Sequence, residues 1–206
     1  LPFDPLFVSS NDPATIHIRK ENASGCFDVK SIVTNIAFCD VTWIGVVNND
    51  WNVPGNWNTG AIPTVFNNVF IPSTVDLAAQ LPTPGVDPII LIGGLNGYAR
   101  NFYLSTGSNL TIQTGKALNV HGNWQAQTTA AIQGEGSVIF GALSGAKFIN
   151  GSTSFPRMIN NNADVLTISS GMQTITRVLG LQQGILAGNN RITLASDAAN
   201  TGLIDN

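Results

Sequence analysis

Aromatic side chains are the groups in this 206-residue sequence that are best suited to binding a ligand. Indole and phenol rings stack on the apolar faces of sugars, while nearby Asn and Gln side chains supply hydrogen bonds. The candidates for a carbohydrate site are Trp51, Trp57 and Trp124, with Tyr98 and Tyr103 as further rings. The structural alternative is that Trp43, Trp51 and Trp57 plug one end of a repetitive core. We favour this alternative, because an open solenoid end needs a cap.

Carboxylates are the groups that glycoside hydrolysis would need, as a pair held about 5 to 10 Å apart. The acids available for this role are dispersed along the chain: Asp76, Asp87, Glu135 and Asp164. The basic residues of the repetitive region do not cluster with these acids in the sequence. Two histidines, His17 and His121, are too few for a histidine metal site. We therefore predict no catalytic residues and expect that the chain is not an enzyme.

Oxygen ligands for a metal ion are also sparse. Asn48, Asn49, Asp50 and Asn52 could offer oxygens to calcium, but the alternating acidic loop and its bidentate Glu are missing. The segment 160–164 allows the same two alternatives, calcium ligands or a turn, and we favour the turn. Stacking of its asparagines at a corner of a solenoid is a further structural alternative. The sequence thus predicts no metal site and no cofactor, with calcium as the alternative.

The two cysteines, Cys26 and Cys39, have no CxxC spacing and no companion histidine cluster. They form either a disulfide or two reduced, buried thiols, and the sequence leaves both alternatives open. The low charge and turn-rich composition favour an oxidising, extracellular location.

Composition restricts both the fold and the partners. Charged residues make up only 10% of the chain, and the sequence contains two Glu, whereas exposed helices normally use Glu, Lys and Arg. Helix should therefore be scarce and the fold all-β. With nine Lys and Arg and a net charge of -3, the chain lacks the basic patch that nucleic acid requires. Because no apolar run approaches the length of a spanning helix, we expect no membrane insertion.

Two kinds of β pattern position these residues. Apolar and polar residues alternate at 15–19 and 27–32 around a turn-rich spacer, which predicts a β-hairpin. Further along, the pattern Gly-x-x-apolar-x-apolar occurs at 107–112 and 115–120, with looser copies at 136–140 and 145–149. Such a short repeat matches one face of a solenoid, and three faces would form a coil of roughly two dozen residues.

The repeats predict which side chains point inward. Leu110 and Ile112 should face the core with Thr111 outside, and Leu118 and Val120 should repeat this around Asn119. Glycines at the repeat boundaries should occupy corners with positive φ. We predict a parallel β-helix, with a β-sandwich as the alternative.

The expected organisation has three parts. Residues 1–40 form a hairpin segment of a sandwich domain, residues 41–72 form a Trp-rich cap, and residues 73–206 form the β-helix repeats.

The Trp-rich segment carries a resemblance to a known kind of module. Thr42-Trp-Ile-Gly, Asp50-Trp, Pro54-Gly-Asn-Trp and the following Ile-Pro pairs resemble a signature in large secreted proteins of the Bacteroidetes. That resemblance implies parallel β-helix repeats, of the right-handed kind, within a multidomain adhesin-like protein. It also implies that the N-terminal hairpin is the end of an immunoglobulin-like domain.

These observations together lead to a prediction of function. We expect an extracellular structural or adhesive module of a bacterial surface protein, self-assembling into fibres through its ends. Its partners would be neighbouring domains, other copies of itself or surface polysaccharide. The alternatives are a carbohydrate-binding module and, third, a polysaccharide lyase or hydrolase.

Overall fold

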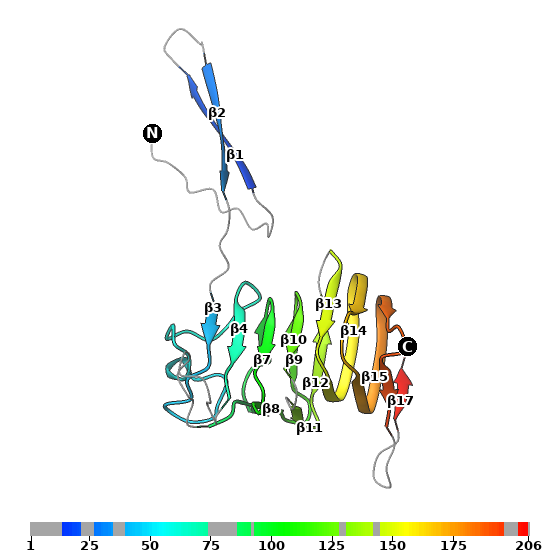
Figure 1. The fold of residues 1–206 in the computed structure, drawn as a ribbon. Helices are drawn as coiled ribbons and strands as arrows, with labels where there is room; N and C mark the ends of the chain where they lie inside the picture. The colour runs from blue at the N-terminus through cyan, green and yellow to red at the C-terminus, as the bar shows by residue number, and fades with distance from the viewer. Residues whose placement is uncertain are drawn as a thin grey trace. The chain divides into compact units, whose positions relative to one another are not determined.

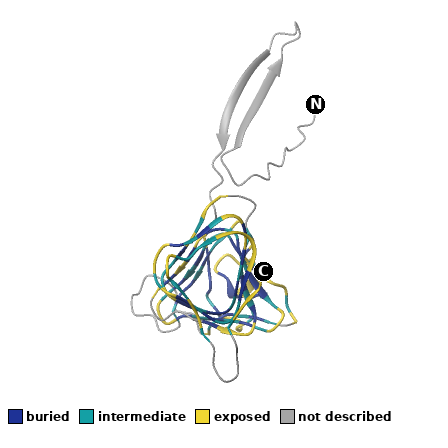
Figure 2. Cartoon of the chain, turned by 90° about the vertical axis from the view of Figure 1, so that its right-hand side faces the viewer, coloured by how far each residue is buried: buried dark blue, intermediate teal, exposed yellow. Residues whose placement is uncertain are grey.

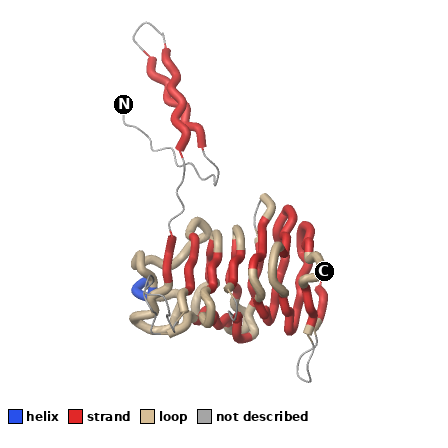
Figure 3. The backbone as a smooth tube through the Cα atoms, viewed as in Figure 1, coloured by secondary structure: helices blue, strands red, loops and turns tan. Residues whose placement is uncertain are grey.

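Figure 1 shows a computed structural model of the chain, which describes residues 14–21, 27–34, 40–73, 86–91, 93–127, 131–141, 145–195 and 202–205. The chain divides into two compact units, Leu1–Phe38 and Cys39–Asn206. Within the described ranges the only helix is the short turn η1 (Pro54–Asn56), and the other regular elements are strands (Figure 3). None of the described helical structure is long and apolar enough to cross a membrane.

The first unit contains the predicted hairpin. Strand β1 (Ala14–Glu21) pairs antiparallel with β2 (Phe27–Thr34), with Ile16 opposite Ile32. The assignment of this hairpin to an immunoglobulin-like sandwich stays a prediction, as does the division at residues 40 and 72. Cys26 and Cys39 lie outside the described residues.

The second unit is a parallel β-solenoid with three faces, which confirms the predicted fold class; the right-handed winding stays a prediction. One face contains β3 (Asp40–Thr42), β4 (Asn68–Ile71), β7 (Phe102–Leu104), β10 (Trp124–Ala126) and β13 (Lys147–Asn150). A second contains β5 (Ile89–Ile90), β8 (Asn109–Ile112), β11 (Ala131–Gly134) and β16 (Ile192–Leu194). The third contains β6 (Gly97–Ala99), β9 (Ala117–Val120), β12 (Ser137–Phe140) and β17 (Leu203–Asp205).

Two long strands, β14 (Thr153–Ile168) and β15 (Gln173–Ala187), bend around all three faces in succession. Register shifts interrupt their pairing near Phe155 and Asn161, where the strand turns from one face to the next. Leu110 is in register with Ile132, and Val138 with Met158, so one coil takes slightly fewer residues than the two dozen expected from the sequence.

Buried residues alternate with more exposed ones along the strands of the tube, as the burial colours of Figure 2 show in a view along its length. The four residues predicted to face inward, Leu110, Ile112, Leu118 and Val120, are buried. Thr111 and Asn119 lie between them on the outer surface and are partly exposed. The alternation of apolar and polar residues in the sequence therefore corresponds to the inward and outward sides of the strands.

Glycines occupy several corners, as expected. Gly107 and Gly115 have φ values of 77° and 74°, a region that residues with a Cβ rarely adopt. The boundary expected at Gly136 is different, because the positive φ belongs to Gly134 instead. At that residue the backbone runs so close to the previous coil that an added Cβ would collide with the carbonyl oxygen of Ile112.

A ladder of amide side chains runs along the corner before the first face. Asn68 Nδ2 donates to the Asp40 carboxylate (2.9 Å), and Asn101 Nδ2 donates to Asn68 Oδ1 (2.8 Å). Asn101 Oδ1 in turn accepts from the backbone N–H of Asn123 (2.7 Å). Stacked asparagines are thus present, but in this column and not at 160–162, where Asn160 and Asn162 are buried.

Candidate functional site

The Trp-rich segment closes the N-terminal end of the solenoid core. Trp43, Trp51 and Trp57 are buried, and Trp57 makes edge-on contacts with the other two at ring-centroid distances of 5.0 and 4.6 Å. Trp43 Nε1 donates to the carbonyl oxygen of Val86 (2.7 Å) and Trp57 Nε1 to that of Trp51 (2.9 Å). This arrangement agrees with the plug that we favoured from the sequence.

Asn56 organises the loops that cover these rings. Its Oδ1 accepts from the backbone N–H groups of Val47 and Asn48, and its Nδ2 donates to Asn48 Oδ1 and to the carbonyl oxygen of Asp50. The side chain is buried, so these bonds replace the water that it would otherwise need.

Trp124 lies further along the core, on β10, and is also buried. Its ring stacks on Phe102 (4.8 Å) and packs against Phe155 (5.2 Å), while its Nε1 donates to Thr153 Oγ1 (3.0 Å). The hypothesis of a sugar platform made by Trp51, Trp57 and Trp124 therefore fails on geometry, because none of the three presents a ring face to solvent. Sequence alone does not separate a buried from an exposed indole.

The two tyrosines lie on different faces. Tyr103 stacks on Phe70 outside the first face, with centroids 4.4 Å apart and nearly parallel planes. Because that stack follows the direction of coil stacking, each ring covers a face of the other. Tyr98 is 39% exposed on the third face and remains a ring that a ligand could reach.

The structure does not bring the predicted acids together. Asp87 accepts from the backbone and side-chain nitrogens of Asn109, and Asp164 accepts from the backbone N–H of Gly145. Asp76 lies outside the described residues. Across the part of the chain that is described, no group of three His, Cys, Asp or Glu side chains is placed to hold a metal ion.

The segment considered for calcium is a set of turns. Asn48 Oδ1 accepts from the N–H of Asp50, and Asp50 Oδ1 accepts from the N–H of Asn52 (2.9 and 2.8 Å). These side-chain oxygens accept hydrogen bonds from backbone N–H groups two residues further along the chain, as is usual in turns.

His121 follows β9 and is half-buried. Burial and then the positive charge of Lys147 lower the pKa of His121 below its usual 6.5. The pKa of Lys147 is lowered too, first by burial and then by Arg100, with Asp164 opposing the shift.

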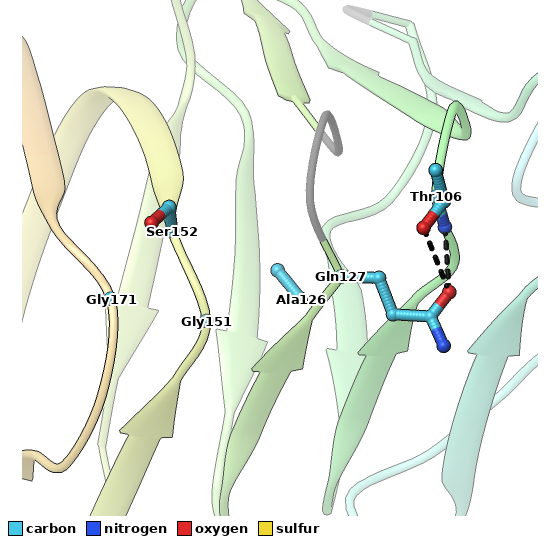
Figure 4. A pocket seen from close by; sticks show the side chains of 6 residues that line it. All are labelled: Thr106, Ala126, Gln127, Gly151, Ser152 and Gly171. Carbon is cyan, nitrogen blue, oxygen red and sulfur yellow. Dashed lines mark hydrogen bonds between the residues drawn. The ribbon is translucent and has the colours of Figure 1, made fainter.

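A first hollow, of about 500 Å³, opens at the corner between the first and second faces (Figure 4). Its lining is uncharged and consists of Thr106, Ala126, Gln127, Gly151, Ser152 and Gly171. Gln127 Oε1 accepts from both the backbone N–H and the hydroxyl of Thr106 (2.8 and 3.2 Å), so the acceptor is engaged within the wall. The hollow offers few free groups to a ligand.

A second hollow, of about 380 Å³, lies at the corner between the second and third faces. Its lining is Asn96, Thr114, Gly115, Lys116, Ala117, Glu135, Ser137, Ile139 and Arg157. Glu135 is bound by Arg177 (2.7 Å) and by the Thr114 hydroxyl (3.0 Å), and Arg157 Nε donates to its carbonyl oxygen (3.2 Å). Basic residues that lie far from Glu135 in the sequence therefore cluster with it in the fold.

This cluster could have been found from one signal. Lys116, Glu135, Arg157 and Arg177 follow one another at intervals close to the length of a coil. Residues separated by one coil lie side by side in a solenoid, so a periodic search at that spacing would have grouped them.

The fold and these surfaces define a parallel β-solenoid protein with a closed N-terminal end and polar outer corners. The chain belongs to the family described as Domain of unknown function (DUF8693), whose model matches residues 42–172. The match begins in the Trp-rich cap and extends to the turn before β15. No curated protein and no solved structure matches the chain significantly.

Proposed function

We propose that the chain is an extracellular, non-catalytic structural or adhesive module of a bacterial surface protein, and that its last coil associates with a second copy. The observation that carries this proposal is that inward-facing residues of the last coil are uncovered. Ile204 lies in register with buried Leu179 but is 52% exposed, and Leu194 lies in register with buried Ile175 but is 37% exposed.

The backbone of that coil supports the same interpretation. Among the described strands, β16 and β17 each pair on one side only, with β15. A strand edge with free N–H and C=O groups is a template for pairing with another chain. Apolar side chains and open backbone groups thus occur together at the same end.

The N-terminal end bears on the kind of assembly. A fibre built from end-to-end contacts requires two open ends, whereas the tryptophans close the first coil. We therefore favour a tail-to-tail pair, in which the same surface of each copy meets its equivalent, over the fibre expected from the sequence.

Stacked coils would suit such a module mechanically. The amide ladder from Asp40 to Asn123 ties consecutive coils together outside the core, in addition to the parallel strand pairing. Hydrogen-bonded side chains repeated along one direction stiffen a rod against bending.

Light scattering across a range of concentrations, combined with negative-stain microscopy, tests this proposal. The unchanged chain should form pairs as its concentration rises, and Ile204→Lys should keep it monomeric by placing a charge on the contact surface. Leu95→Lys is the matched control, since Leu95 is an exposed residue of the turn before β6. Strictly monomeric behaviour of the unchanged chain, or equal effects of the two substitutions, would overturn the association.

A further inference from the structure

The second hollow, at the corner between β11 and β12, concentrates positive charge in a chain that is otherwise acidic. Lys116, Arg157 and Arg177 surround a single acid, Glu135, so the local charge is positive while the formal net charge of the chain is -3. Glu135 is already paired with Arg177 through a 2.7 Å contact. The charges of Lys116 and Arg157 therefore remain uncompensated by an acid in the lining of the hollow.

Both cations keep donors available to a ligand. Among the described residues, Arg157 donates only from Nε, to the carbonyl oxygen of Glu135, which leaves its two terminal nitrogens unengaged. Lys116 Nζ donates to the carbonyl oxygen of Gly94 (2.5 Å), and an ammonium group has three protons. An anion in the hollow would find donors from two different coils.

Strand register sets the distance between these donors. Ala117, Ser137 and Arg157 are in register on consecutive coils, and Lys116 precedes the first of them. Because neighbouring strands lie about 4.8 Å apart, the backbones that carry Lys116 and Arg157 are separated by about 10 Å along the solenoid. That separation suits a ligand whose negative charges are spaced along a chain.

The outer surface beside the hollow supplies the other contacts of a sugar chain. Ser137 and Thr114 bear hydroxyls, and Asn96 bears an amide, all within the lining. A second outward column runs from Tyr98 through Asn119 to Ile139, again in register. An exposed phenol ring and an aliphatic side chain would pack on the C–H faces of a sugar, which polar groups alone cannot do.

We propose that this hollow, lined by Lys116, Glu135 and Arg157, together with Tyr98 on the adjoining outer surface, binds an acidic polysaccharide whose sugar units carry carboxylates. Arg157 and Lys116 donate to carboxylates on separate sugar units. Between them, Glu135 accepts hydrogen bonds from sugar hydroxyls, and the Ser137 hydroxyl donates to or accepts from others. The site is independent of the association through the last coil, so either proposal can fail without the other.

Two other anionic partners fit the same observations less well. Single-stranded nucleic acid needs several exposed rings on which bases stack, and Tyr98 is the one aromatic residue in the two outward columns that form this surface. An acidic peptide that binds by strand addition needs an open sheet edge, whereas β12 is paired on both sides, with β9 and β14.

Isothermal titration of the folded chain with oligogalacturonate at low salt is the direct experiment. Neutral dextran fragments of the same length and inorganic phosphate serve as comparison probes. Arg157→Gln and Lys116→Gln should each weaken oligogalacturonate binding by about tenfold, because each removes a charge-assisted hydrogen bond. Tyr98→Ala should weaken it several-fold. Arg191→Gln, which removes one positive charge directly before β16 and outside the lining of the hollow, should leave it unchanged.

Each outcome decides the proposal. Selective loss in the Lys116, Arg157 and Tyr98 variants, with circular dichroism spectra like those of the unchanged chain, would support it. Equal binding of dextran, complete displacement by inorganic phosphate, insensitivity to Tyr98→Ala or the absence of any titration heat would each overturn it. Tighter binding of a single-stranded oligonucleotide or an acidic peptide than of oligogalacturonate would replace the glycan with that partner.

Discussion

The first and last described coils of the solenoid differ in how far their inward-facing side chains are covered. At the N-terminal end, Trp43, Trp51 and Trp57 fill the tube and are themselves covered by hydrogen-bonded loops. At the C-terminal end, Leu194 and Ile204 continue the inward columns but have nothing above them among the described residues. A parallel stack of coils has no intrinsic stop, so the last coil of a stack exposes its interior unless a further coil, a cap or another chain covers it.

The difference concerns the stability of the closed end and, under the association proposed above, the contact surface at the other end. Burying a large aromatic residue removes 150 to 250 Å² from water, at roughly 25 cal/mol per Å². At the closed end, this stabilisation comes from the three buried tryptophans of the chain itself. The open end leaves apolar side chains in water, and covering them would favour contact with a second copy.

The largest expected effect comes from opening the closed end. Trp57→Ala should lower the free energy of unfolding by about 3 to 5 kcal/mol, because it leaves a cavity between two other buried rings. Denaturant titration followed by tryptophan fluorescence and circular dichroism measures this loss. Leu95→Ala, at an exposed position, should change the midpoint little. A loss below about 1 kcal/mol for Trp57→Ala would show that the plug does not stabilise the fold.

A smaller effect should separate two members of one column at the open end. Leu179→Ala removes a buried side chain and should cost about 2 to 3 kcal/mol, whereas Ile204→Ala should cost less than about 1 kcal/mol, since Ile204 is half in water. Thermal unfolding at low protein concentration, where the chain is monomeric, compares the two. Equal losses would mean that the last coil is covered in solution, and the contrast between the ends would disappear.

The smallest effect concerns the middle of the stack, between the two ends. Burial, then Lys147, lowers the pKa of His121 in the folded chain, so the unfolded chain binds the proton more readily. The stability linked to neutral His121 is complete above its unfolded pKa of about 6.5 and decreases as the pH falls below that value. The thermal midpoint should therefore decrease between about pH 7.5 and pH 5.5, and His121→Gln should reduce this decrease. An unchanged pH profile in that variant would show that the histidine is protonated equally in both states.

Local patterns were enough to predict the fold class and much of the core. Two local features carried this information: the alternation of apolar residues at 110–112 and 118–120, and the corner glycines at 107 and 115. Each depends on only a few neighbouring residues, so a short stretch of sequence is enough to predict it. The plug was also predictable, because three tryptophans precede the repeats. The prediction of a sugar platform was wrong, because the sequence does not show whether a tryptophan ring faces water or the core.

Local preferences in the amino-acid sequence specify an all-β chain whose glycine-bounded, period-two repeats stack as coils, because those preferences act over a few residues. Which polar residues come into contact depends on how the coils stack. Lys116, Glu135, Arg157 and Arg177 are distant in the chain and become neighbours because each coil returns the backbone to the same corner. The fold also sets which apolar residues are exposed, since Ile204 and Leu179 occupy the same column, yet Leu179 is buried and Ile204 is 52% exposed.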